Sequence, residues 1–225
     1  MRWLAFTSLW LVSCTSITPV SYGEQLFHDA EFAGSQYNAW SCSTCHSTQE
    51  MDDTKLSGHT LAGVTTRPHY WGGNTLRLID AVSFCYVYFM RGPQPLDAKE
   101  TRARALYAYL DSLKGSAEPK KVTWVPNLKE IPLGDKALGK TVYAASCQVC
   151  HGEIHTGKGR NSPLASLLPE VRGDYKQLFP GVAPSLVFTE KVRHGQFFSV
   201  GGNMPPFALE RLSDEELGAL LSYLE

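Results

Sequence analysis

The chain has 225 residues, of which 43% are hydrophobic and 19% are charged, and its formal net charge is −1 at pH 7. This composition is ordinary for a globular protein, and the length fits two small units better than one large unit. The sequence contains no basic cluster that would indicate binding to nucleic acid. It also contains no acidic run that would indicate a partner attracted by long-range electrostatics.

The first 22 residues have the features of an export leader. Arg2 precedes an apolar run over residues 3–12 that is too short to span a bilayer. Leu11-Val12-Ser13-Cys14 then resembles the lipobox of bacterial lipoproteins, in which the cysteine becomes the lipidated N-terminus. We therefore expect a protein of the periplasm, or otherwise outside the cytoplasmic membrane, tethered through a lipidated Cys14. The alternative is an ordinary signal peptide with a coincidental cysteine.

Two five-residue motifs follow in the chain, Cys42-Ser43-Thr44-Cys45-His46 and Cys147-Gln148-Val149-Cys150-His151. C-x-x-C-H is the attachment motif for c-type haem, since two thiols add to the haem vinyl groups and the adjacent imidazole ligates the iron. The sequence thus predicts two covalently attached haem c groups, with His46 and His151 as iron ligands. A disulfide or half of a zinc site is the alternative for each C-x-x-C, but neither explains the histidine.

The segment before each motif begins in the same way. Gly23 and Gly139 are each followed four residues later by an aromatic residue, Phe27 and Tyr143. Counted from the glycine, the first cysteine of the motif lies 19 residues later in the first copy and only eight residues later in the second. We expect the additional residues of the first copy, around Gly34–Asn38, to loop out.

Two sulfur atoms compete as the second iron ligand in the first copy. Met90 precedes Tyr109 by 19 residues, and Met204 of the second copy precedes Tyr223 by the same distance. This spacing favours Met90 as ligand. Cys85 is the alternative, because a free cysteine in an exported protein requires an explanation. His59 and His69 are reserve ligands in the same region.

A helix in each copy follows the methionine and ends in Tyr-Leu. In the first copy it begins near Pro95 or Asp97, and in the second Ser213 with Glu216 predicts a capping box. We expect both helices to pack on the helix that bears C-x-x-C-H. Between the copies, residues 115–132 contain three prolines and are predicted to be a linker. This predicts one unit over residues 23–116 and another over residues 117–225.

These features resemble the class I cytochrome c family. The resemblance implies an all-α fold of two tandem cytochrome c domains, each a small helical fold wrapped around a covalent haem, with Met204 as an iron ligand. It also implies that the carbonyl of Pro163, twelve residues after His151, accepts the N–H of the histidine ring. Gly58 stands at the corresponding place after His46, so another backbone group must accept that N–H in the first copy. Tryptophans 40, 71 and 124 are expected to pack in the haem pockets.

The segment around Cys85 is similar to the first domain of dihaem thiosulfate dehydrogenases, in which the distal ligand is a cysteine. Methionine is a neutral donor that raises the haem potential, whereas a thiolate lowers it. Two functions follow: an electron carrier between a redox protein donor and acceptor, or a thiosulfate dehydrogenase-like enzyme with Cys85 on the first haem. The sequence favours the carrier, because Arg91 is the only cation near Cys85 in the sequence to receive an anionic substrate.

Overall fold

The structure, a computed structural model, describes residues 16–126, 129–195 and 204–225. Cys14 and the segment from Gln196 to Asn203 lie outside the described residues. The described elements are all helical: α1 (Pro19–His28), α2 (Cys42–Cys45), the 3-10 turns η1 (Val64–Thr66) and η2 (Trp71–Gly73), α3 (Leu78–Phe84), the π-helical turn η3 (Cys85–Phe89), α4 (Thr101–Ser112), α5 (Lys136–Val142), the π-helical turn η4 (Tyr143–Cys147), α6 (Gln148–His151), α7 (Arg172–Leu178), α8 (Pro184–His194) and α9 (Asp214–Tyr223).

The prediction of an all-α fold is confirmed. Apart from one isolated bridge between Tyr70 and Thr75, the described residues form no β-structure. None of the described helices is both long and apolar enough to cross a membrane. α1 begins at Pro19, because Thr18 caps the helix and proline suits the first helical position. Its first turn therefore lies within the predicted leader of residues 1–22.

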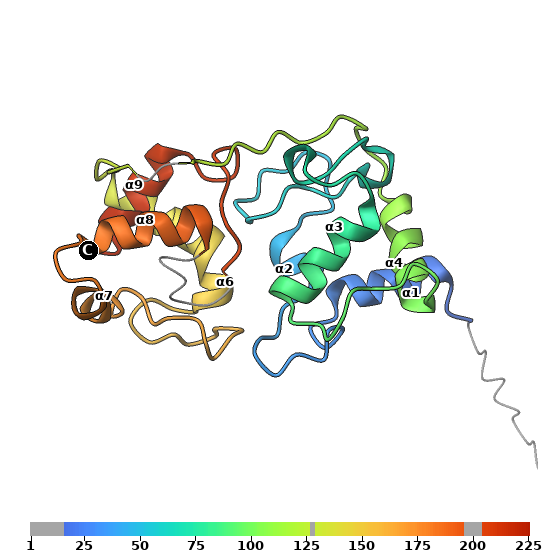
Figure 1. The fold of residues 1–225 in the computed structure, drawn as a ribbon, viewed down its shortest axis with the longest axis horizontal. Helices are drawn as coiled ribbons and strands as arrows, with labels where there is room; N and C mark the ends of the chain where they lie inside the picture. The colour runs from blue at the N-terminus through green and yellow to red at the C-terminus, as the bar shows by residue number, and fades with distance from the viewer. Residues whose placement is uncertain (1–15, 127–128, 196–203) are drawn as a thin grey trace, which may run out of the picture.

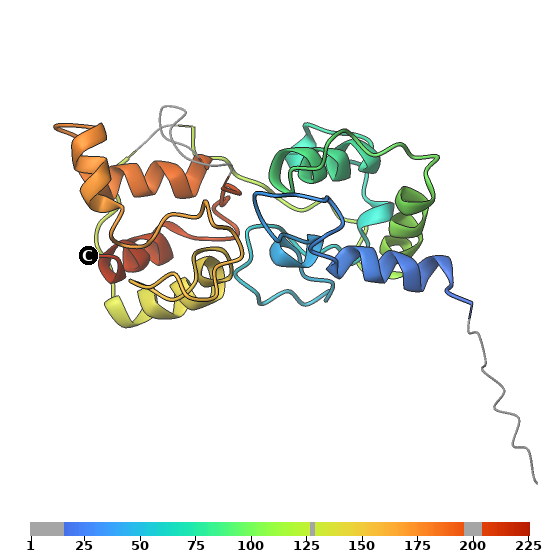
Figure 2. The same ribbon diagram turned by 90° about the horizontal axis from the view of Figure 1, so that it is seen from below.

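The helices gather into two groups joined by an extended segment (Figures 1 and 2). Each group has its own hydrophobic core, one formed by residues between 26 and 110 and the other by residues between 142 and 224. In the first half α1 packs against α4, and in the second half α5 packs against α9. We call the two groups the first half and the second half.

The repeated glycines explain this pairing of helices. A Cβ added at Gly23 would stand 2.0 Å from the carbonyl oxygen of Ala105, and one at Gly139 would stand 2.0 Å from that of Ala219. Glycine therefore allows the two backbones to approach closely in both halves. The aromatic residue four positions later contacts the tyrosine of the partner helix, with ring centroids 5.4 Å apart in the first half and 5.7 Å apart in the second.

The helix that follows each methionine agrees with prediction in part. Ser213 and Glu216 form the expected capping box at the start of α9. The start predicted for α4 near residues 95–97 is wrong, since the helix begins at Thr101 after Glu100 as N-cap. Asp97 instead accepts hydrogen bonds from the amides of Lys99 and Glu100, which closes a turn before the helix.

The helices that bear the motifs are joined differently in the two halves. In the second half α5 continues through η4 into α6, so that α9 packs on the same continuous helix that leads into the motif. In the first half the motif lies on the separate short helix α2. The prediction that α4 packs on the motif helix is therefore wrong for the first half, because the additional residues after α1 separate the two.

The additional residues of the first copy form an irregular loop as expected, with Gly34, Gln36 and Tyr37 exposed, and the end of this loop contacts the second half. Asn161 of the second half accepts hydrogen bonds from the Ala39 amide (2.8 Å, at its carbonyl) and from Trp40 Nε1 (2.7 Å, at Oδ1). Ser162 Oγ donates to the Tyr37 carbonyl over 2.9 Å. Trp40, after this loop, is buried with its indole N–H paired, as an amphipathic ring prefers. This segment forms part of the contact between the halves.

The predicted linker lies along the first half rather than apart from it. Lys120, Val122 and Trp124 line the pocket of the first half, and the Trp124 ring stacks on Trp71 with centroids 6.2 Å apart. Thr123 donates through its amide and its hydroxyl to Glu210 of the second half. The segment thus connects the halves and also covers one of them.

Candidate functional site

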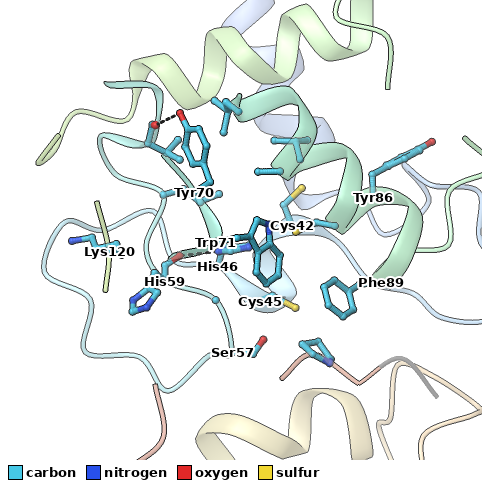
Figure 3. A pocket seen from close by; sticks show the side chains of 18 of the residues that line it. Cys42, Cys45, His46, Ser57, His59, Tyr70, Trp71, Tyr86, Phe89 and Lys120 are labelled. Atoms are coloured by element: carbon cyan, nitrogen blue, oxygen red, sulfur yellow. Dashed lines mark hydrogen bonds between the residues drawn. The ribbon is translucent and has the colours of Figure 1, made fainter. Parts of the chain in front are cut away.

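The first candidate site is an apolar pocket between α2, α3 and the linker. Cys42, Cys45 and His46 all line this pocket (Figure 3). Most of the remaining lining is aromatic or aliphatic, including Trp40, Tyr70, Trp71, Tyr86, Phe89 and Leu106. A large, flat, apolar cofactor suits this pocket, because the lining is mostly apolar and includes the two motif thiols.

The His46 ring is held by the backbone. Its Nδ1 donates a hydrogen bond to the carbonyl of His59 over 2.8 Å (Figure 3). Because Nδ1 bears the proton, Nε2 of the neutral ring retains the lone pair that a metal ligand needs. Burial lowers the pKa of His46, which also favours the neutral ring. The expectation that another backbone group replaces the missing proline is confirmed, and the group is the His59 carbonyl.

The motif cysteines are free thiols. None of the five described cysteines forms a disulfide, which argues against that alternative for both motifs. In the described part of the chain, no three or more His, Cys, Asp or Glu side chains are grouped as a metal ion would require. Burial raises the pKa of the thiols of Cys42, Cys147 and Cys150 to about 12. Two neutral thiols and one neutral imidazole at each pocket fit covalent attachment of haem.

The second candidate site is a pocket whose lining includes Cys147, Cys150 and His151. The His151 Nδ1 donates to the carbonyl of Ser166 over 2.9 Å, so the predicted role of Pro163 is wrong. The amide of Ala165 donates to the Ser162 carbonyl and closes a turn around the proline. The chain therefore reaches the imidazole three residues later than the family pattern implies.

Residues 134–224 match the sequence profile of the family described as cytochrome C oxidase, cbb3-type, subunit III. These residues are similar to a cytochrome c domain, which supports a c-type cytochrome. In c-type cytochromes haem c is bound covalently.

One solved structure is similar to the chain over most of its length. It is thiosulfate dehydrogenase (TsdBA) from Marichromatium purpuratum in its "as isolated" form, with 16% identity, a TM-score of 0.45, and coverage of 97% of this chain and 48% of that chain. The chain thus spans about half the length of that protein. No curated protein matches the sequence.

Met204 lines the second pocket together with the motif residues. A Cβ at Gly195 would stand 2.3 Å from the Met204 carbonyl oxygen, and the Phe207 amide donates to the Val192 carbonyl. These contacts hold the backbone at and after the methionine against α8 and the residue that follows it. Its ligation of iron stays a prediction.

Cys85 and Met90 both line the first pocket, at opposite ends of η3. Met90 is buried, with 5% of its surface exposed. Burial raises the pKa of the Cys85 thiol well above its usual range, and the nearby Cys45 and Cys42 raise it further. Both sulfur donors therefore reach the same site as the sequence predicted.

The reserve ligands and the tryptophans also lie at the first pocket. His59, His69, Trp40, Trp71 and Trp124 all line it, as expected for residues packed around a cofactor. Burial lowers the pKa of His59 to about 4. His59 thus contributes its carbonyl to His46 and a neutral ring to the wall.

Sequence reasoning missed three cations that line the first pocket, Arg67, Lys120 and Arg211. Arg67 is buried and donates through Nη2 to the carbonyls of Thr60 (3.0 Å) and Ala62 (2.6 Å). Arg91 itself lines the second pocket instead of the first, so the cations on the wall of the first pocket come from the loop, the linker and the second half. No local motif in the sequence marks these three residues.

The two pockets are neighbours. Five residues line both of them: Trp40, Cys45, Ser57, Phe89 and Pro205. Cys150 of the second motif also packs against the core of the first half. The attachment cysteines of the two motifs therefore approach each other at a shared wall.

Proposed function

We propose that the protein is a dihaem electron carrier built of two tandem cytochrome c domains, residues 23–116 and 117–225. One haem c is attached to Cys42 and Cys45 with His46 as iron ligand, and the other to Cys147 and Cys150 with His151. Met90 and Met204 are the proposed second ligands. The shared wall between the two pockets is the observation that supports this function, because it brings two redox centres close enough to exchange electrons.

The chain's own residues perform the supporting tasks. The carbonyls of His59 and Ser166 hold the two imidazoles in the tautomer and orientation that a metal ligand requires. The apolar walls exclude water from the sites. The haem supplies the one-electron chemistry, while the protein sets its potential through ligands and surroundings. A methionine sulfur on each iron would favour high potentials.

A second candidate function is the oxidation of a small sulfur anion at the first haem. Cys85 in the first pocket and the cations Arg67, Lys120 and Arg211 on its wall support this function. Arg211 is already bonded to two carbonyls and paired with Asp52, whereas Nε of the buried Arg67 has no hydrogen-bond partner, so Arg67 and Lys120 are the charges available for a substrate. We rank this function second, because the spacing of Met90 and Tyr109 favours Met90 over Cys85 as the iron ligand.

The proposed location is outside the cytoplasmic membrane, with a lipid on Cys14 and redox proteins as donor and acceptor. The lipobox-like sequence before Cys14 supports the tether. Mass spectrometry of the mature N-terminus tests it: we expect a lipidated Cys14, and an unmodified start after this residue would reject the proposal.

The haem count tests the dihaem function. After expression in a host that attaches c-type haem, the alkaline pyridine spectrum and the intact mass should show two haems per chain. Replacing Cys42 and Cys45 by alanine should remove one haem, and replacing Cys147 and Cys150 should remove the other. One haem in the unaltered protein would contradict the proposal. Reduction of an external acceptor that depends on thiosulfate would favour the second candidate function.

A further inference from the structure

Arg211 joins the second half to the loop that supports the proximal histidine of the first. It follows the turn at Ala208 in the second half, and only 7% of its surface is exposed. Its Nε donates to the Leu56 carbonyl over 2.8 Å, and its Nη2 donates to the Thr54 carbonyl over 2.8 Å. Its Nη1 forms an ion pair with Asp52 Oδ2 over 3.1 Å. The angles at this contact do not meet those of a hydrogen bond.

The loop is therefore held from the second half at several consecutive residues. Asp52 is as buried as Arg211, with 6% of its side chain exposed. Ser146 of the second half donates to the Lys55 carbonyl over 2.8 Å, between the two carbonyls that Arg211 binds. The planar guanidinium suits this task, because its donors diverge in a fixed fork.

The held segment leads directly to the groups that orient His46. Two residues after Leu56, the Gly58 amide donates to the Cys45 carbonyl over 2.9 Å, and the next carbonyl, that of His59, accepts the His46 Nδ1 proton. A shift of residues 54–56 would move the His59 carbonyl relative to the imidazole, because only two residues separate them.

We propose that Arg211 is a positioning residue for the first haem, acting across the contact between the halves through the His59 carbonyl on His46. It thereby makes the ligand strength of His46 depend on the docking of the second half. The proposal rests on the proposed function only in that a haem is attached at Cys42 and Cys45. Nothing in it requires a second haem.

The direction of the effect follows from ligand basicity. The hydrogen bond from Nδ1 makes the imidazole a stronger donor, which favours Fe(III) and lowers the haem potential. Loosening the His59 carbonyl should raise the potential. Loss of the positive charge of Arg211 would act in the opposite sense, because a nearby cation favours the reduced state. A variant that keeps the positive charge but lacks the planar guanidinium donors separates the loosening of the His59 carbonyl from the loss of charge.

Arg211→Lys is that variant. We expect the potential of the first haem to rise and that of the second to stay, in a redox titration that follows the hyperfine-shifted methyl resonances of each haem. The Nδ1 proton of His46 should also exchange faster with solvent. The matched control is Lys55→Met, which removes the 2.7 Å ion pair to Glu216 in the same contact but leaves the Lys55 carbonyl in place. The control should raise neither potential, since loss of a cation can only lower it.

An unchanged or lowered potential of the first haem in Arg211→Lys would overturn the proposal, as would an equal shift of both haems. If that variant does not fold, Thr54→Val removes a neutral hydroxyl 3.3 Å from Nη2 and should produce a smaller rise, whereas no rise would again overturn the proposal. The haem count is independent of these readings. A protein with a single haem at Cys42 and Cys45 would reject the dihaem function and still allow the test of Arg211.

Discussion

Gly58 lies against the imidazole of His46 so closely that a Cβ at residue 58 would stand 2.3 Å from Cε1 of the ring. The same Cβ would stand 2.8 Å from the Cys45 carbonyl oxygen. No other residue type fits between the ring and the loop without moving one of them. The glycine that replaces the family's proline in the first copy is therefore a steric requirement of this site.

Gly58→Ala should impair haem attachment at the first site alone. The added methyl group displaces His46 or the loop, and we expect the haem content to fall from two per chain toward one. The pyridine spectrum and peptide mass spectrometry measure this loss. Gly173→Ala in α7 is the control, because a Cβ there meets no atom within 4 Å. The control should keep both haems and change the free energy of unfolding by no more than about 1 kcal/mol. Equal loss in both variants would contradict the steric argument.

Asn161→Ala should weaken the contact between the halves. Trp40 is 8% exposed, and its indole N–H would lose its partner in a buried setting. An unpaired buried donor costs about 1–3 kcal/mol of unfolding free energy. Denaturant unfolding measures the loss, with Asn74→Ala as control, since that exposed side chain bonds only within its own turn. A loss for Asn161→Ala within about 0.5 kcal/mol, the usual range for a surface substitution, would show that the bond does not stabilise the contact.

The second half should lose stability in acid through Asp214. Hydrogen bonds from Lys129 (2.5 Å) and Arg193 (2.9 Å) lower the pKa of this carboxyl group below its ordinary value. The unfolded chain therefore takes up the proton first as pH falls, so the stabilisation is complete above the unfolded pKa of about 3.9 and is lost as pH falls through the lower folded value. Melting temperatures between pH 6 and pH 2 measure this decline.

Asp214→Asn should be less stable than the unaltered protein at neutral pH and should decline less steeply in acid. Asp53→Asn, at an exposed carboxylate of the first half, should keep the slope of the unaltered protein. An unaltered slope in Asp214→Asn would show that this group does not contribute to the acid dependence.

The two sulfur donors of the first pocket can be told apart by spectroscopy. We expect the oxidised protein to show the weak long-wavelength band of methionine ligation at two-haem intensity. Cys85→Ala should leave this band unchanged, whereas Met90→Ala should reduce it by about half, since one of two methionine ligands is lost. Low-spin thiolate signals in electron paramagnetic resonance that disappear in Cys85→Ala would contradict ligation by Met90.

The sequence was informative where short-range patterns decide the structure. The paired Gly23 and Gly139 and the Tyr-Leu endings predicted the repeated elements, and the structure shows each glycine at a close contact between two helices. The capping box of Ser213 and Glu216 was also found as predicted. Such features depend on residues within one turn or on a repeated spacing, so they can be recognised without the fold.

Contacts between distant segments could not be predicted in this way. Trp40 and Asn161 are 121 positions apart, and Arg211 and Leu56 are 155 apart. Neither pair has a local pattern. The carbonyl that accepts from His151 was assigned to Pro163 by family spacing, but a turn at Ser162 moves that role to Ser166. Turn geometry of this kind depends on how the loop packs.

The first pocket is lined by residues from both halves of the chain, so neither half forms its complete pocket alone. Val122 and Trp124 of the linker and Pro206 of the second half close one side of the first pocket. A fragment that ends at Ser116 would retain Cys42, Cys45 and His46 but would lack the lining residues Val122, Trp124 and Pro206. The same residues would be missing if the first half alone were transferred into another protein. Although the glycines and tyrosines repeat along the chain, the two halves depend on each other in their tertiary structure.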